Sequence, residues 1–307
     1  MRLATPSRMI ALLGAAVLTL GVSACSPDAG TASAEGGSGA ASHDATDPTM
    51  DRYEPAAELL PERIAEAGVL RAAIPTNEPP TQFYREGTKE MTGINPDIAR
   101  LVAGALGLEL QIEVANFDSI IPGIEADRYD LTVSSMTPTE ERMQVLDFVE
   151  YLAMGDGLVV QSGNPQQLGF DQLCGKKVGV LTGSYQLTVN VPVLNDACTA
   201  AGSDPLSIQQ FQDTAQAMGS LTSGRSDAVY ADGPILAYAA TQNPGIEVVG
   251  ERDLAPVGIG IGRGTGLLDA VKAAMDHILT TDEYRAVLES YGVGSMAITE
   301  ANVNVPQ

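Results

Sequence analysis

Residues 129–142 read Tyr-Asp-Leu-Thr-Val-Ser-Ser-Met-Thr-Pro-Thr-Glu-Glu-Arg. The first five residues alternate and include branched side chains, which is typical of a buried β-strand. Thr137 then has the features of a helix N-cap, with Pro138 at the first helical position and Glu140 at the third, as in a capping box. A strand that runs into a helix directs unpaired backbone N–H groups and the positive end of the helix dipole at one spot. This pattern predicts an anion site at the end of the strand.

Polar side chains at the same place favour a carboxylate as the anion. Ser134 and Ser135 supply hydroxyl donors, and Thr137 adds a third hydroxyl. Arg142, expected one turn into the helix, supplies a planar guanidinium fork that matches a carboxylate. The alternative is an ordinary capped helix with an arginine on its surface.

The stretch from Ser134 to Arg142 resembles the signature of the family 3 extracellular solute-binding proteins, the polar amino acid receptors of ABC importers. The resemblance extends from about Glu66 to Gly292. It implies an α/β protein with the type II periplasmic-binding-protein fold, in which two α/β lobes are joined by a two-stranded hinge. In that family the signature stretch holds the α-carboxylate of the ligand.

The amino-terminal stretch, residues 1–24, is expected to be a lipoprotein signal peptide. Arg2 and Arg8 precede an apolar segment, Met9–Val22, that is short for a membrane span. The following Val-Ser-Ala-Cys resembles a lipobox, which implies a lipidated Cys25 and an extracytoplasmic protein anchored to the cell membrane. An uncleaved anchor is the alternative. Residues 25–55 are rich in small and polar residues and are expected to form a flexible tether.

Charge and cysteine content exclude several classes of function. The net charge of −22 argues against binding to nucleic acid or to anionic lipid. In an exported protein, Cys174 and Cys198 predict a disulfide, and two buried free thiols are the alternative. The two histidines, His43 and His277, lie in the tether and in a helical run, so neither a metal site nor a Ser/His/Asp arrangement is expected. We expect no cofactor.

Alternating strand and helix patterns predict α/β lobes with helices on both faces of a sheet. We expect one lobe from residues 56–160 and 254–295, a second from 161–253, and a tail without a pattern at 296–307. The segments 158–160 and 257–262 are the expected crossings between the lobes. Ile98, Leu101 and Val102 recur at helical spacing and are expected to face the core.

The resemblance adds ligand-binding positions on the first lobe. Glu78 occupies a position that is more often aromatic in the family, so its carboxylate could pair with a cationic ligand or simply face solvent. Phe117 stands where the family has an aromatic ring over the ligand side chain, with a core position as the alternative. Thr81 replaces the usual Phe or Met, and Phe83 or Tyr84 could supply the missing ring.

On the second lobe, the sequence after Val180 repeats the strand–turn–helix pattern, and Gly183 frees the turn. Backbone N–H groups and the hydroxyl near Ser184 and Tyr185 are expected to contact the carboxylate from the far side. The resemblance assigns Asp232 to the ligand α-ammonium. Because Asp232 precedes Gly-Pro, the alternative is a helix N-cap.

Together these residues predict a receptor that captures a polar or cationic amino acid between two closing lobes. Arg142 and Asp232 would come from opposite lobes, so only the closed form would hold both ends of a zwitterion. The expected partners of this monomer are a membrane permease and its ATPase. A sensor that docks on a membrane signalling protein is one alternative. A dehydratase-like enzyme that uses Glu78 as a general acid is another.

Overall fold

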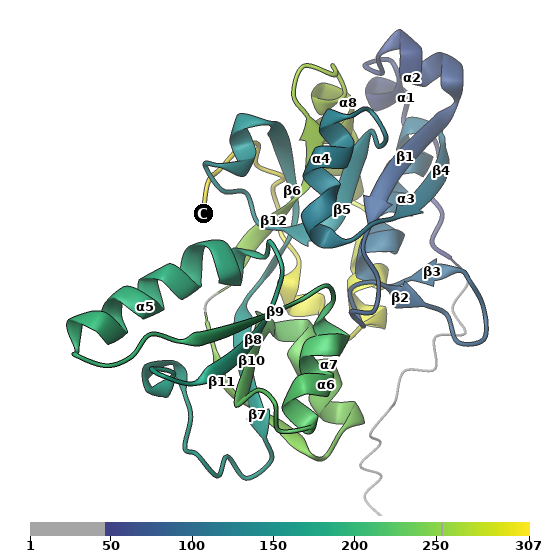
Figure 1. Ribbon diagram of the computed structural model, residues 1–307. Helices are drawn as coiled ribbons and strands as arrows, with labels where there is room; N and C mark the ends of the chain where they lie inside the picture. Colours follow the sequence, from purple (N-terminus) through teal and green to yellow (C-terminus); the bar gives the residue numbers. More distant parts are fainter. Residues whose placement is uncertain (1–46, 253) are drawn as a thin grey trace, which may run out of the picture. The chain divides into compact units, whose positions relative to one another are not determined.

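The computed structural model describes residues 47–252 and 254–307, so the expected signal peptide, Cys25 and most of the tether lie outside the described residues. Two five-stranded sheets form the centres of two lobes (Figure 1). The first sheet contains β1 (Val69–Ile74), β4 (Glu109–Val114), β5 (Leu131–Met136), β6 (Leu146–Met154) and β12 (Ala255–Gly262). The second contains β7 (Asp156–Gln161), β8 (Lys177–Leu181), β9 (Ser207–Phe211), β10 (Ala228–Asp232) and β11 (Ile246–Glu251). This arrangement confirms the predicted α/β class.

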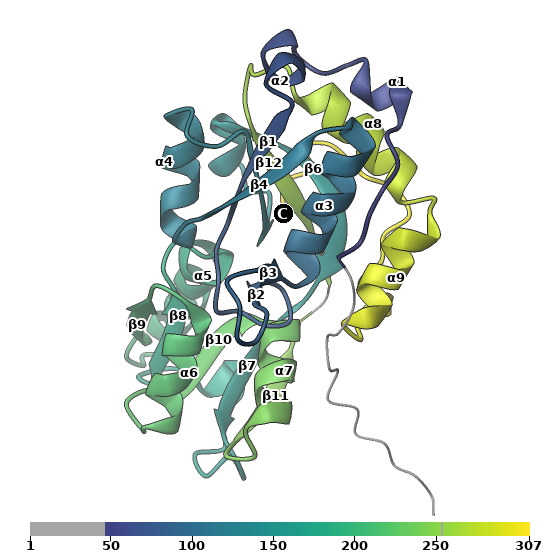
Figure 2. The same cartoon turned by 90° about the vertical axis from the view of Figure 1, so that its right-hand side faces the viewer.

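In the first sheet the strand order is β4-β1-β5-β12-β6, with β1 parallel to β4 and β5, and β12 antiparallel to β5 and β6. Its helices are α1 (Glu54–Ala57), α2 (Glu62–Ala67), α3 (Ile94–Leu106), α4 (Ile120–Glu125), α8 (Leu268–Ile278) and α9 (Asp282–Ser290). Figure 2 shows α4 on one side of the sheet and α3 with α8 on the other. A two-stranded hairpin, β2 (Phe83–Tyr84) and β3 (Met91–Thr92), lies between β1 and α3 in the chain.

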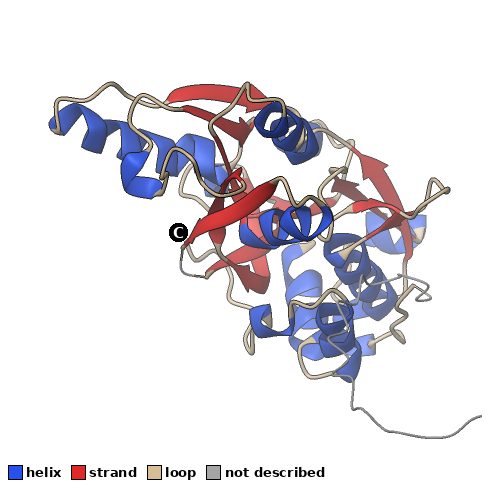
Figure 3. Ribbon diagram, turned by 90° about the horizontal axis from the view of Figure 1, so that it is seen from below, coloured by secondary structure: helices blue, strands red, loops and turns tan. Residues whose placement is uncertain are grey.

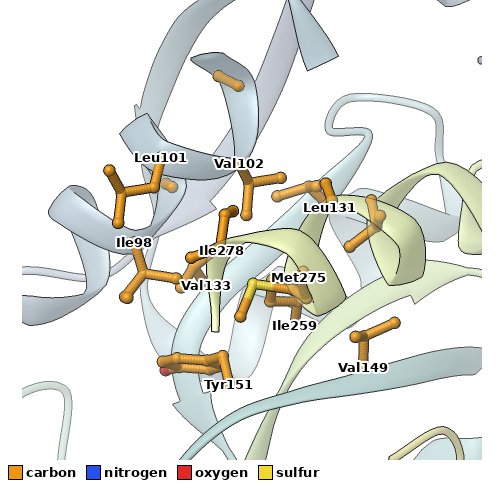
Figure 4. Close-up of a cluster of buried hydrophobic side chains, with 14 of the residues drawn as sticks. Ile98, Leu101, Val102, Leu131, Val133, Val149, Tyr151, Ile259, Met275 and Ile278 are labelled. Carbon is orange, nitrogen blue, oxygen red and sulfur yellow. The ribbon is translucent and has the colours of Figure 1, made fainter. Parts of the chain in front are cut away.

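The larger core of the first lobe lies between its sheet and helices α3, α8 and α9 (Figure 4). Ile98, Leu101 and Val102 of α3 are fully buried there, which confirms the helical periodicity predicted from sequence. They pack in the same cluster as Val133 of β5 and Met275 of α8. A smaller cluster on the opposite face includes Phe117, so the end of β5 is held by packing on both sides.

In the second sheet the strand order is β11-β7-β10-β8-β9, with β8 parallel to β9 and β10, and β7 antiparallel to β10 and β11. Leu158 and Val160 of β7 face the cluster that contains Cys198, whereas Val159 faces the opposite cluster with Leu221. The covering helices are α5 (Val191–Ala200), α6 (Thr214–Thr222) and α7 (Gly233–Gln242). Figure 3 shows the strands flanked by helices in both lobes.

The chain crosses between the sheets twice, at positions that correct the predicted boundaries. It leaves β6 at Met154 and enters β7 at Asp156, and it returns from the end of β11 at Glu251 to the start of β12 at Ala255. Met154 pairs with Ala255, so the two crossings lie side by side as a two-stranded hinge. Residues 156–160, which the sequence analysis placed in the first lobe, belong to the second sheet because β7 pairs with β10 and β11.

Residues 47–55, the described end of the expected tether, and residues 296–307, the expected tail, include contacts with the first lobe. The backbone N–H of Tyr53 donates to Ala105 O (2.8 Å), and the Tyr53 ring stacks on His277. At the other end Val303 bridges Val149, and the N–H of Gln307 donates to Pro138 O (2.9 Å). The sequence of these segments shows no periodic pattern, because each is held by isolated pairings and not by a continuous strand or helix.

The sequence analysis did not identify β6 or α5. Cys174 and Cys198 form the predicted disulfide, with Cα atoms 5.5 Å apart. Among the described residues, no helix is long and apolar enough to span a membrane.

Candidate functional site

The signature stretch ends β5 as predicted, but the expected α-helix at Pro138 does not form. An α-helix would pair the carbonyls of Thr137 and Pro138 with N–H groups four residues later. Instead Thr137 O accepts from Arg142 Nη1 (2.8 Å), and Pro138 O accepts from the N–H of Gln307. The backbone N–H of Arg142 donates to Thr139 Oγ1 (3.2 Å), and a single 3-10 turn, Arg142–Gln144, follows. The predicted capping box is therefore wrong.

Arg142 projects from this turn across the gap between the lobes. Its Nη2 donates to Gly183 O of the second lobe (2.8 Å), and its guanidinium carbon lies 5.5 Å from the centre of the Phe117 ring. The side chain is buried, with 7% of the residue exposed. Burial lowers the pKa of Arg142 to about 10, partly offset by the charges of Glu141 and Asp232. Arg142 stays charged at neutral pH and forms no salt bridge with any described carboxylate.

Neighbouring polar groups orient the Ser135 hydroxyl near the end of β5. Ser135 Oγ accepts from Asn95 Nδ2 (3.0 Å), and the backbone N–H of Ser135 donates to Tyr151 OH (2.9 Å). Ser135 has a φ of 54°, a left-handed conformation that is uncommon for serine. Because its hydroxyl accepts one bond, its own hydrogen stays available to a further acceptor.

The second lobe presents a corresponding turn after β8. Gly183 adopts a φ of 77°, and a Cβ there would lie 3.3 Å from the Asp118 Cβ of the first lobe. Ser184 Oγ accepts from the N–H of Leu187 (3.2 Å), which again leaves the hydroxyl hydrogen available. The backbone N–H of Ser184 donates to Leu181 O (3.2 Å), so Ser184 offers its hydroxyl rather than the predicted amide.

Asp232 ends β10 and occupies the N-cap position of α7, yet its side chain does not cap the helix. Its Oδ1 instead accepts from Gln186 Nε2 (2.8 Å). Burial, helped by the nearby Asp156 charge, raises the pKa of Asp232 to about 6 against the Gln186 bond and the Arg142 charge. A carboxylate held this way is suited to accept an incoming cation.

Glu78 is buried, with 3% exposed, which excludes the solvent-facing alternative. Its Oε1 accepts from Thr214 Oγ1 (2.6 Å) and from the Thr214 backbone N–H (3.3 Å), both in the second lobe. Its Oε2 accepts from Gln82 Nε2. Burial raises the pKa of Glu78 to about 7, against these three bonds.

All nine predicted ligand-binding residues line one cavity between the lobes. These are Glu78, Phe117, Ser134, Ser135, Thr137, Arg142, Ser184, Tyr185 and Asp232. Phe83 and Tyr84, the suggested substitute rings, do not line this cavity. The sequence analysis missed five lining residues: Leu181, Gln186, Thr214, Ala231 and Ile235. Gln186 and Ile235 lie beside predicted positions, whereas Thr214 carries no ligand signal in the sequence.

The cavity's chemistry suits a small zwitterion rather than a metal ion. No group of three or more His, Cys, Asp or Glu residues in the described ranges could hold a metal. Arg142 and Asp232 offer opposite charges from different lobes, and Ser135 and Ser184 offer hydroxyl donors beside Arg142. An ammonium and a carboxylate on one ligand would satisfy both charges at once.

Comparisons with known proteins agree with this architecture. An arginine-binding protein, ArgT, of Corynebacterium glutamicum is 31% identical over 248 residues, which cover 80% of this chain and 81% of that protein. A solved structure of an ancestral arginine-binding protein bound to arginine has a TM-score of 0.67 at 30% identity, and the match covers 73% of this chain and 98% of that one. The ancestral amino acid-binding protein AncCDT-1, described as a precursor of cyclohexadienyl dehydratase, has a TM-score of 0.65 at 26% identity, covering 75% and 98%.

A sequence profile of the bacterial extracellular solute-binding proteins, family 3, matches residues 70–294. The matched segment includes both hinge crossings, every residue that lines the cavity, and all of both sheets except Val69. On this match the chain belongs to the bacterial extracellular solute-binding proteins, family 3.

Proposed function

We propose that this protein captures an amino acid outside the cytoplasm and delivers it to the membrane permease of an ABC importer. The observation that carries the proposal is the pair of opposite charges, Arg142 and Asp232, that face one cavity from different lobes. Neither side chain forms a salt bridge within the described chain. Burial lowers the pKa of Arg142 and raises that of Asp232, and both shifts favour the neutral form. A bound zwitterion would supply both missing partners.

In the proposed complex the α-carboxylate lies on the Arg142 guanidinium and accepts from the hydroxyls of Ser135 and Ser184. The α-ammonium donates to Asp232, which Gln186 already orients. Phe117 covers the ligand and also supports the Arg142 guanidinium through the face of its ring. Because these groups come from both lobes, the bound ligand stabilises the closed form, which is the form that a permease would recognise.

We further propose that the ligand side chain is cationic and points toward Glu78. A buried carboxylate with a raised pKa gains from a positive partner, which would restore its ionised form. The relatives named as arginine-binding support this choice. Glu78 would then select against acidic side chains, because two carboxylates in one buried site repel.

The amino-terminal features complete the proposal. A lipidated Cys25 would anchor the protein, and a tether would let a monomer reach its permease and ATPase partners. We propose binding without chemical turnover. The dehydratase alternative rests on Glu78, whose pKa near 7 suits a general acid, and on the resemblance to AncCDT-1.

Calorimetric titration with arginine, lysine, glutamine and glutamate tests the proposal, together with Glu78→Gln as an isosteric variant. We expect arginine or lysine to bind best, and Glu78→Gln to weaken their binding by about 30-fold or more, the cost of losing one partner of a buried charge pair. Glutamine affinity should change by less than about threefold. Absence of binding by all four, or equal losses for cationic and neutral ligands, would contradict the assignment. Conversion of a cyclohexadienyl hydroxy acid to an aromatic product, with loss of water and carbon dioxide, would favour the enzyme.

A further inference from the structure

One direct contact between the lobes at the cavity does not involve the groups that would hold the ligand's zwitterion. The loop after β1 carries Asn77 and Glu78, and the amino terminus of α6 carries Asp213 and Thr214. Glu78 accepts from both the hydroxyl and the backbone N–H of Thr214, and Asn77 Nδ2 donates to Asp213 Oδ2 (3.3 Å). A carboxylate from one lobe therefore caps a helix of the other.

The position of Glu78 at the amino terminus of α6 strengthens the hydrogen bonds that its carboxylate accepts. The first N–H groups of a helix have no partner within the helix, and they attract negative charge. Asp213 already accepts the N–H of Gln216 as the N-cap of α6 (2.8 Å), and Glu78 takes the N–H of Thr214 just after it. When Glu78 is ionised, the hydrogen bonds that it accepts belong to the stronger class in proteins. Thr214 is itself 2% exposed, so water is excluded from the contact.

A second set of contacts fixes Glu78 from its own lobe. Gln82 donates to Glu78 and accepts from Asn95 Nδ2, and the same Asn95 amide also donates to Ser135 Oγ. The far oxygen of Glu78 is therefore fixed whether the lobes are open or closed. The oxygen that faces Thr214 acquires its donors only when the lobes approach each other.

We propose that Thr214 is a positioning residue that latches the closed form through Glu78 and completes the side-chain end of the cavity before a ligand enters. The latch makes a closed population available to the ligand-free protein, because it needs no atom of the ligand. It also fixes the carboxylate that a cationic side chain would meet. This goes beyond the proposed function, since the ligand-free closure does not depend on which solute binds.

Four proteins test the latch: wild type, Thr214→Val, Thr214→Ser and Thr222→Val. Valine keeps the shape of threonine and removes its hydroxyl, whereas serine keeps the hydroxyl. Thr222 is the matched control, because it lies at the other end of α6 and its hydroxyl bonds only within the helix, to Gly219 O. The first measurement is the radius of gyration of the ligand-free proteins by small-angle X-ray scattering.

We expect ligand-free Thr214→Val to be more open than wild type, and Thr214→Ser and Thr222→Val to match wild type. With saturating arginine, Thr214→Val should return to the wild-type radius, and its Kd should be about 10-fold weaker, the equivalent of one such hydrogen bond. Equal radii for ligand-free wild type and Thr214→Val would overturn the latch. The scattering comparison uses no ligand, so its failure is distinct from a failure of any amino acid to bind.

Discussion

Replacement of Arg142 by alanine should remove most of the affinity for an amino acid. The side chain is 7% exposed, so water screens its interactions weakly. Its pKa of about 10 keeps it charged at pH 7 despite burial. Truncating one partner of a buried charge pair costs about 2–5 kcal/mol, which corresponds to a Kd weaker by about 30- to 5,000-fold.

The same substitution affects the unliganded protein, and the two effects must be measured separately. Arg142→Ala also leaves the carbonyls of Thr137 and Gly183 without their guanidinium donor. Each lost bond should lower the free energy of unfolding by about 1 kcal/mol. We therefore expect a lower melting temperature together with an intact circular dichroism spectrum, and calorimetric titration then gives the Kd of the folded protein.

Two further variants separate charge, geometry and local packing. Arg142→Lys keeps the positive charge but loses the planar fork, so its affinity should fall between those of wild type and Arg142→Ala. Arg263→Ala is the matched control, because Arg263 donates to Met143 O beside the same turn, is largely exposed and does not line the cavity. Arginine affinity within about threefold of wild type for folded Arg142→Ala would refute the reasoning.

Two more predictions concern protons and covalent structure. A ligand ammonium that pairs with Asp232 lowers a pKa that is about 6 in the unliganded form, so binding releases a proton and arginine affinity should fall as the pH drops below 6. Because the Glu78 pKa is about 7, we expect arginine affinity to begin falling already between pH 7 and 6. In calorimetric titrations across pH 5–8, Glu78→Gln should lose this earlier part of the fall. An arginine affinity that does not change with pH would contradict both assignments. Cys198→Ser should lower the free energy of unfolding by about 3 kcal/mol through loss of the Cys174 crosslink, or about 6–12 °C in melting temperature, with unchanged ligand preference. An unchanged melting temperature would show that the disulfide does not stabilise the fold.

The sequence predicted the elements whose cause is local. Val133 lies in a buried strand because alternating, branched residues favour a strand. Ile98, Leu101 and Val102 line one face of a helix because apolar residues recur there at helical spacing. The cavity-lining positions followed from the family resemblance and from turns at strand ends. Those turns meet in space because the parallel strands β5 and β1, and β8 and β10, end on the same edges of their sheets.

The sequence could not reveal features that depend on distant partners. The capping box at Thr137 was wrong because Gln307, far along the chain, occupies a carbonyl that a helix would have used. The environment of Glu78 depends on Thr214, which is 136 residues away. A local pattern cannot distinguish a carboxylate that faces water from one that caps a helix in another lobe, since both occur in polar loops.

The closed cavity combines contacts that favour closure with charges that oppose it. Glu78 and Thr214 join the lobes directly, and Arg142 adds its bond to Gly183 O. Against these bonds, burial moves the pKa of Arg142 down and that of Asp232 up, so each loses free energy by remaining charged. A zwitterion removes this cost at both groups, whereas a ligand with only one of the two charges leaves the other buried and unpaired. Selectivity for amino acids over simple amines or acids then follows from the penalty for the group left unpaired, rather than from the number of contacts made.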